Sequence, residues 1–198
     1  MKVPIALLVG LLAVLPAASV PSQGPKHSSV VEKAFRAGGS VRLDLSAGEY
    51  VIRGTPDDTI RLRWHTRTSE DAARVQADVV VDGQSASVRT GGPKDGFSVE
   101  IDLPSRTNIN LSLSAGDLKV RGLQGNKDIS VWAGDVLLEV GSPDQYRKVD
   151  ASVRLGDLTM QPFGLDNTGG VFRSRSWSGS GEYTIKAALF AGDLKLVR

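Results

Sequence analysis

The sequence predicts an all-β protein, built as a single-stranded β-solenoid-like repeat array and capped by an irregular N-terminal β portion. A phrase of the form strand, Gly-acid, strand recurs five times, and apolar residues around it alternate with polar ones. Glycine is frequent, with 22 of 198 residues, and aromatic residues make up 6%. This composition suits many tight corners and a core of aliphatic side chains. An antiparallel β-sandwich with similar hairpins is the alternative fold.

Residues 1–19 have the features of a signal peptide. Lys2 precedes an apolar run at 3–15, and the small residues Ala17, Ala18 and Ser19 fit a cleavage site. The run is shorter than the ~20 residues that span a bilayer, so we expect an exported, cleaved protein with no stable membrane span after signal removal. An uncleaved anchor is the alternative. The chain has no cysteine, which excludes disulfides and a cysteine-linked lipid anchor.

The segment 20–33 is polar, contains Pro21 and Pro25, and is predicted to be a linker. Residues 34–104 are predicted to form the N-terminal β portion. Within it, the sequence indicates a strand at 59–67, a helical turn at 69–75 capped by Ser69, and a hairpin of 76–82 with 85–90. A further strand at 97–104 is closed by a proline. We expect this block to cover one end of the array, because exposed strand edges invite association.

Residues 105–198 are predicted to be the repeats. The aligned glycines of the five phrases are separated by 68, 18, 22 and 36 residues; they are Gly48, Gly116, Gly134, Gly156 and Gly192. Because 36 is twice 18, a period of about 18–22 residues runs from position 109 to the end, with one degenerate copy between the last two glycines. Units of this kind share a core only when they stack.

The apolar pattern predicts a corner at each of these glycines. Ile109, Leu111 and Leu113 alternate with polar residues, and after Gly116 the apolar positions resume at Leu118. The alternation therefore slips by one residue, as a bulge or corner would cause. Alanine precedes four of the glycines, which indicates little room there. Leu155 replaces it before Gly156, so we expect that corner to be looser.

The chain ends at Arg198, directly after the last repeat. We expect this last layer either to be covered by residues 163–182 or to be open to weak end-to-end self-association.

The segment 97–140, with Leu103-Pro104 followed by repeated strand, Ala-Gly-Asp, strand units, resembles the bacterial putative-adhesin family of uncharacterised exported repeat domains. The resemblance covers about residues 35–198, although that family usually carries Ser-Gly-Asp at the corners. It implies an extracytoplasmic, solenoid-like domain of the cell envelope, and it brings no catalytic residues with it.

No catalytic, cofactor-binding or metal-binding residues are predicted. The only histidines are His27 and His65, and His65 is expected to be an outward strand residue. The segment 122–127 lacks the spacing of a phosphate-binding loop. The net charge falls from +2 to +1 when Lys2 leaves with the signal peptide (23 basic against 22 acidic residues), which gives no indication of a nucleic-acid partner.

Three groups of side chains remain as candidates for binding. The corner acids could form a calcium ladder, although Asp beside Gly more commonly favours a turn through backbone hydrogen bonds; they are Glu49, Asp117, Asp135, Asp157 and Asp193. Outward basic residues could line one polysaccharide-binding wall, or serve as solvated surface; they are Lys119, Arg121, Arg154 and Lys195. Trp132 and Phe190 share an outward register and would either bind sugar rings or a partner, or pack under residues 163–182, which we favour. Trp64 is expected in the core.

The sequence therefore predicts a non-enzymatic, adhesin-like interaction domain of the bacterial cell envelope, whether periplasmic, outer-surface or secreted. The expected partner is an envelope protein or a glycan, with no cofactor. A carbohydrate-active or polysaccharide-binding solenoid protein is the alternative function, and an accessory role in envelope stress sensing also fits the sequence.

Overall fold

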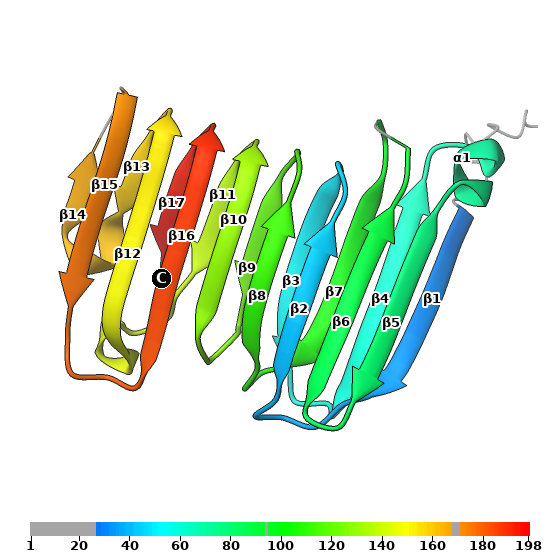
Figure 1. Ribbon diagram of the computed structural model, residues 1–198, viewed down its shortest axis with the longest axis horizontal. Helices are drawn as coiled ribbons and strands as arrows, with labels where there is room; N and C mark the ends of the chain where they lie inside the picture. The colour runs from blue at the N-terminus through cyan, green and yellow to red at the C-terminus, as the bar shows by residue number, and fades with distance from the viewer. Residues whose placement is uncertain (1–26, 94, 168–170) are drawn as a thin grey trace, which may run out of the picture.

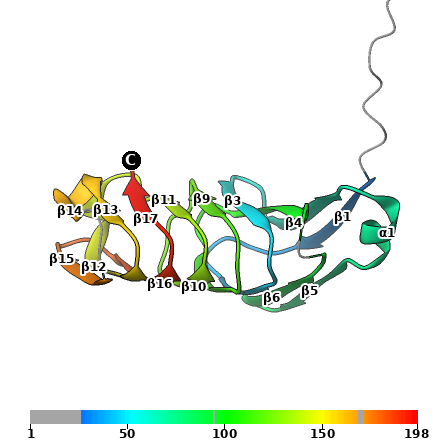
Figure 2. The same ribbon diagram turned by 90° about the horizontal axis from the view of Figure 1, so that it is seen from above.

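The computed structural model describes residues 27–93, 95–167 and 171–198. The predicted signal peptide and the first part of the predicted linker lie outside these residues. The strands form two mixed sheets that lie face to face and enclose the core (Figures 1 and 2). The prediction of a mostly β chain is confirmed. Among the described residues, no helix combines the length and apolarity needed to cross a membrane.

Within the described residues, sheet A has nine strands. In spatial order they are β1 (His27–Ala34), β4 (Thr59–Thr66), β7 (Ser98–Pro104), β3 (Glu49–Thr55), β9 (Leu118–Arg121), β11 (Val136–Glu139), β17 (Leu194–Val197), β13 (Leu158–Met160) and β14 (Leu165–Asn167). Sheet B has eight strands in the part of the chain that the structure describes. In the same direction as sheet A they are β5 (Gln76–Asp82), β6 (Ser85–Gly91), β2 (Ser40–Leu45), β8 (Asn108–Leu113), β10 (Lys127–Ala133), β16 (Tyr183–Ala191), β12 (Tyr146–Leu155) and β15 (Val171–Ser178).

Each corner glycine joins a strand of sheet B to the next strand of the chain in sheet A. The resulting two-strand units are β2–β3, β8–β9, β10–β11, β12–β13 and β16–β17. Neighbouring units pair in parallel in both sheets. Antiparallel pairs occur only toward the two ends among the described residues: β1 with β4, β4 with β7, and β5 with β6 at one end, and β12 with β15 and β13 with β14 at the other. The antiparallel sandwich alternative therefore does not describe the centre.

The order of the units in space differs from their order in the chain. Unit β2–β3 has the unit β8–β9 on one side. On its other side lie β7 in sheet A and β6 in sheet B. Unit β16–β17, the last in the sequence, lies between β10–β11 and β12–β13. The expectation that the last repeat forms the last layer is therefore wrong. Strands β14 and β15 lie beside β13 and β12 instead, and in place of the predicted degenerate repeat these two strands pair antiparallel with that unit.

The core lies between the sheets and follows the predicted alternation. Ile109, Leu111 and Leu113 are buried on β8, and Leu118 and Val120 are buried on β9. The one-residue slip at the corner is therefore confirmed, and it keeps apolar side chains inside as the chain passes from one sheet to the other. Trp64 packs partly buried against the same core, as expected.

The corner glycines form a single column. A Cβ on Gly116 would overlap the carbonyl oxygen of Gly48, one on Gly134 that of Gly116, one on Gly192 that of Gly134, and one on Gly156 that of Gly192. All of these glycines except Gly48 have a φ between 112° and 134°, which side chains disfavour. The Gly156 corner is as tight as the others, so the expected loosening is wrong; Leu155 is accommodated by remaining 46% exposed.

The first end of the stack is closed by β1, β4, β5 and the helix α1 (Ser69–Ala73), as Figure 1 shows. Residues 27–33 belong to strand β1, which corrects the predicted linker. β1 is an edge strand held by backbone pairing with β4, and Val31 packs partly buried against the core. The N-cap of α1 is Thr68, whose hydroxyl accepts from the Asp71 backbone N–H, rather than Ser69. The predicted hairpin is confirmed as β5 and β6.

The opposite end is closed by an aromatic cluster around Tyr146. Its ring lies 6.3 Å from Phe163 and 6.5 Å from Tyr183, and Trp177 packs 4.9 Å from Phe163. Lys127 enters this cluster from an inward position of β10 and is 1% exposed. Its Nζ donates to the Tyr146 hydroxyl at 3.1 Å and to the Gly125 carbonyl at 3.2 Å. No carboxylate is among its hydrogen-bond partners within the described residues.

We expect Gly134→Ala to lower the free energy of unfolding by at least about 3 kcal/mol, because the new Cβ collides with backbone in addition to the φ strain. Gly83→Ala is the matched control: Gly83 also has a positive φ, but nothing lies within 4 Å of a Cβ there. The control should lose only about 1 kcal/mol. Urea unfolding of both variants measures the difference, and equal losses would contradict the glycine column.

We expect the free energy of unfolding to rise by about 2 kcal/mol between pH 7.5 and 9.5. Burial lowers the pKa of Lys127 from 10.5 to about 8, so above pH 8 the unfolded chain binds more protons than the folded one, and raising the pH favours folding. Burial also raises the pKa of Tyr146 to about 12. This shift lowers the free energy of unfolding as the pH rises, but mainly above pH 10, where the tyrosine of the unfolded chain loses its proton. Lys127→Met should flatten this rise in urea unfolding, whereas the exposed Lys186→Met should retain it. If the rise in the free energy of unfolding persists in Lys127→Met, other titratable groups cause it.

Candidate functional site

The outer face of sheet B carries a row of large side chains, which we call the stacking row. It consists of Trp132 on β10, Phe190 on β16, Arg154 on β12 and Phe172 on β15. The strand registers place each of these side chains next to the following one: Val131 pairs with Leu189, Leu189 with Val153, and Val153 with Arg173.

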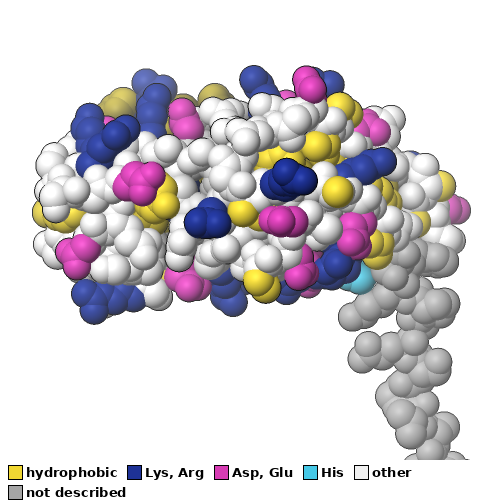
Figure 3. Space-filling model, turned by 90° about the horizontal axis from the view of Figure 1, so that it is seen from below, with side chains coloured by type: hydrophobic (Ala, Val, Ile, Leu, Met, Phe, Trp, Pro, Cys, Tyr) yellow, Lys and Arg dark blue, Asp and Glu magenta, His cyan; other side chains and the backbone are white. Residues whose placement is uncertain are grey.

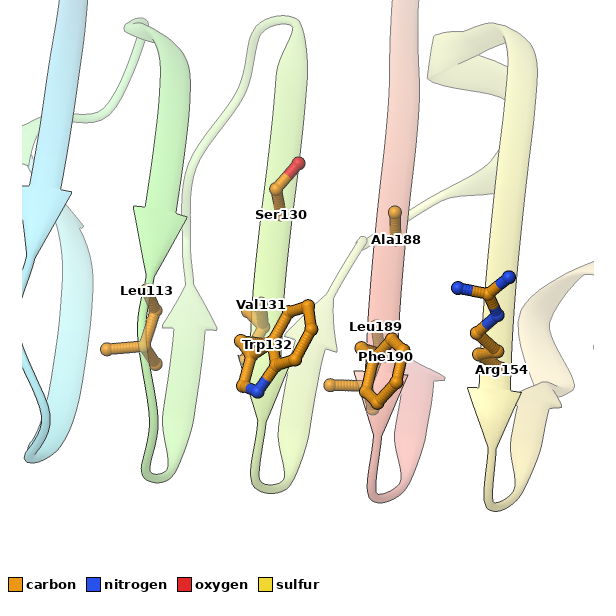
Figure 4. A pocket seen from close by; sticks show the side chains of 8 residues that line it. All are labelled: Leu113, Ser130, Val131, Trp132, Arg154, Ala188, Leu189 and Phe190. Atoms are coloured by element: carbon orange, nitrogen blue, oxygen red, sulfur yellow. The ribbon is translucent and has the colours of Figure 1, made fainter.

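The members of the stacking row are stacked face to face across the strands. The rings of Trp132 and Phe190 are 4.2 Å apart and inclined by only 4°. The Arg154 guanidinium carbon lies 5.5 Å from the Phe190 ring and 5.1 Å from the Phe172 ring, within the range of cation–π contacts. Figure 4 shows Trp132, Phe190 and Arg154 on three successive strands.

The two ends of the stacking row are open to solvent. Trp132 is 63% exposed and Phe172 is 69% exposed. Phe172 is also the one non-glycine residue among those described with a positive φ, at 56°. Backbone strain of this kind is retained where the surrounding structure or a function requires it. A large exposed apolar surface on a soluble domain typically marks a binding surface.

A shallow depression of about 420 Å³ lies beside this row, lined by Trp132, Phe190, Arg154, Ser130 and Ala188 among others. A second depression, of about 400 Å³, adjoins it across Leu113. We call the second one the serine hollow; its other lining residues include Asp44, Ser46, Thr90, Ser112 and Ser114. The stacking row and the serine hollow together form a continuous surface on one sheet face.

The serine hollow and Phe172 were missed at the sequence level, although a signal for the hollow exists. Trp132, Phe190 and Arg154 each lie two residues before a corner glycine, and so do Ser114 and Ser46. These five positions therefore occupy one register on the outer face of sheet B. Phe172 has no such signal, because it lies on the antiparallel return strand.

The favoured packing of Trp132 and Phe190 under residues 163–182 is wrong for Trp132, which is exposed, and Phe190 is half-buried between Trp132 and Arg154. The predicted basic wall does not form either. Lys119 and Arg121 lie on β9 and Lys195 on β17, all in sheet A, whereas Arg154 lies on β12 in sheet B. The stacking row thus takes only Arg154 from that set. His65 is half-buried on β4, and the side chain of His27 lies outside the described residues.

The corner aspartates form a hydrogen-bonded ladder along the glycine column. The Asp117 carboxylate accepts from the Asp135 backbone N–H at 3.3 Å, Asp135 from Asp193 at 3.1 Å, and Asp193 from Asp157 at 3.2 Å. These bonds join neighbouring units, 18 to 58 residues apart in sequence, so they differ from the local turn bonds expected of Asp beside Gly, and they hold the stacked units in register. Within the described residues, no three His, Asp or Glu side chains are grouped so as to hold a metal ion.

In the densest charge cluster, on the outer face of sheet A, the charged side chains pair with one another. Arg53 and Arg63 both pair with Glu100 and Asp102, at distances between 2.6 and 3.2 Å. Burial favours a higher pKa for Glu100, but the two arginines outweigh it and lower that pKa below its ordinary value. This cluster ties β3 and β4 to β7 and offers no free charge for a ligand. Elsewhere, acidic and basic side chains are interspersed, as Figure 3 shows for the side seen from below.

No protein-family model matches this sequence, and no curated protein matches it. A putative cell adhesion protein from Clostridium sporogenes, 16% identical, aligns with 86% of this chain and 99% of its own, with a TM-score of 0.53. A putative adhesin from Bacteroides fragilis is 11% identical, covers 87% of this chain and 98% of its own, and has a TM-score of 0.35. The match to the Clostridium protein confirms the predicted resemblance as a likeness of fold over most of the chain.

We expect Asp135→Ala to lower the free energy of unfolding by about 1 kcal/mol, because the Asp193 N–H loses its acceptor. Asp135→Asn should lose less, since an amide oxygen can accept the same bond. Thermal unfolding with and without calcium measures both effects. If calcium shifts the unfolding midpoint of the wild type and Asp135→Asn abolishes this shift, the corner aspartates bind calcium after all.

Proposed function

We propose that this chain is a non-enzymatic, exported, adhesin-like binding module of a bacterial cell envelope, which contacts its ligand through the outer face of sheet B. The observation that carries this proposal is the exposed stacking row. Four large side chains from four strands are held in register there, and none of them is needed to close the core.

Export is supported by the leader, in which Lys2 precedes an apolar run, and by the absence of cysteine, so that stability does not depend on the redox state of the compartment. The likeness of fold extends to proteins whose names describe cell adhesion, which favours the same class of role here. We further infer that the stacked two-strand units are the turns of a short, irregular β-solenoid, which supplies a flat, rigid platform for binding.

A carbohydrate-active enzyme is the second candidate, because outward carboxylates also lie on sheet B. Asp128 and Asp150 flank Lys186 in one register. Glycoside hydrolysis requires a carboxyl group that holds its proton near neutral pH. Hydrogen bonds from Ser176 and Lys148 instead lower the pKa of Asp150. This shift favours binding without turnover.

The test is binding of the purified, signal-free chain to an array of bacterial and host glycans, together with an assay for new reducing ends. We expect the double variant Trp132→Ala, Phe190→Ala to bind at least ten-fold more weakly than the wild type, because it removes the exposed stack, and no reducing ends to appear. Tenfold corresponds to about 1.4 kcal/mol, in the range of a central aromatic anchor.

Val80→Ser is the matched control. Val80 is 61% exposed on β5, on the same sheet at the opposite end, so it reports a general loss of exposed apolar surface. Equal binding by the double variant and the control would overturn the proposed surface. Reducing ends released from polygalacturonate by the wild type would favour the enzyme instead.

A further inference from the structure

We infer that the free face of the Trp132 indole is a subsite for a flat pyranose ring, which stands over Ser114 in the serine hollow. This inference rests on the proposed function, and it names the ligand as a glycan whose ring substituents are equatorial. It assigns the role of the hollow and explains why the aromatic stack stops where it does.

The stack is open at Trp132 on the side of β8. One face of the indole is covered by Phe190, at 4.2 Å with nearly parallel planes. The opposite face therefore looks along the row toward β8, the strand of Leu113 in Figure 4. Because Val131 pairs with Leu113, the next residue in the register of Trp132 is Ser114. Neighbouring strands lie about 4.8 Å apart, which is close to a stacking distance. A ring placed over Ser114 would extend the stack by one member.

The serine hollow of about 400 Å³ offers space for this ring, and it shares Leu113 with the depression that Trp132 lines. Ser112 is exposed on β8, and the exposed Ser114 follows the end of that strand. Ser46 lies one strand further along the same register as Ser114. If the stack continued beyond Trp132, the positions of Ser114 and Ser46 would each hold a ring. Serine leaves room for a ligand ring, whose edge would rest on β8 and whose second face would look toward β2.

The chemistry of the hollow favours a sugar over an aromatic side chain of a partner. Its rim carries the hydroxyls of Ser46, Ser112, Ser114 and Thr90 and the carboxylate of Asp44. A ring with equatorial hydroxyls has C–H bonds on its faces for the indole and O–H groups at its edge for this rim. The Ser46 and Thr90 hydroxyls already contact the Tyr50 hydroxyl, at 3.3 and 2.7 Å. The exposed hydroxyls of Ser112 and Ser114 are therefore the rim groups that a sugar would bond and that an apolar ring would cover, which costs binding energy.

The rim of the hollow carries little net charge. Asp44 is paired with Arg42 at 3.3 Å and with Arg89 at 3.7 Å, so the carboxylate is compensated and the three groups together carry a single positive charge. Arg154, at the far side of the stack, lies between the Phe190 and Phe172 rings. A neutral, hydroxyl-rich glycan is complementary to such a surface, and a strongly charged ligand is not required.

The experiment uses cellohexaose and chitohexaose as probes for the signal-free chain, by titration calorimetry and by iodide quenching of tryptophan fluorescence. Trp132 is the most exposed of the three tryptophans, since Trp64 and Trp177 are partly buried. We expect at least one hexasaccharide to bind and to reduce iodide quenching, and Trp132→Phe to remove this reduction. If neither hexasaccharide binds, or if binding leaves the quenching unchanged, the subsite is overturned.

Ser114→Phe is the decisive variant, because its side chain would occupy the subsite and complete the stack itself. We expect it to weaken hexasaccharide binding at least ten-fold. Ser85→Phe adds the same ring to an exposed position of β6 in the same sheet and should bind as the wild type does. Circular dichroism verifies the fold of both variants, and the quenching experiment on the wild type remains decisive if Ser114→Phe does not fold.

The outcomes separate the two proposals. A wild type that binds nothing on the glycan array contradicts the proposed function. A wild type that binds the array while Ser114→Phe binds equally well or more tightly contradicts the subsite alone. The chain could instead bind a short Trp-containing peptide and neither hexasaccharide, and lose this binding in Ser114→Phe. That result would contradict a sugar ligand and assign the subsite to a protein partner.

Discussion

The structure depends on the close approach of backbone to backbone at the corner glycines. Each carbonyl oxygen in the column occupies the space that a Cβ of the next glycine would need, so the units can stack at strand spacing only if these residues have no side chain. The aspartates beside them then bond to the next backbone N–H in the column. Together they fix the register of every unit against its neighbours, and hence the register of both sheets.

Because the register is fixed, equivalent residues of successive units form rows across the sheet. Because every unit is aligned at its glycine, residues at the same distance before that glycine share a position on the outer face of sheet B. Trp132, Phe190 and Arg154 come together for this reason, and so do Ser114 and Ser46. The proposed binding surface thus requires no loops of its own. One residue per unit, chosen independently of the core, is enough to define it.

The sequence predicted what depends on local pattern. The alternation of Ile109, Leu111 and Leu113, the slip at Gly116 and the β5–β6 hairpin all follow from side-chain periodicity and turn chemistry. The order of the units could not be predicted, because each presents the same apolar face and the same corner, and the pattern holds no information on which unit lies beside which. Strand β1 was missed since backbone pairing, rather than burial, holds it. The Trp132–Phe190 stack was foreseen only as a shared register.

The position of β16–β17 has a consequence for how the chain folds. The units β10–β11 and β12–β13 are joined directly in sequence, yet their strands do not pair with each other; both pair with residues 183–197. The unit β10–β11 and the unit β12–β13 are therefore joined into continuous sheets only after residues 183–197 insert between them. During synthesis, which proceeds from the N-terminus, the contacts that join these two units therefore form only after residues 183–197 are available.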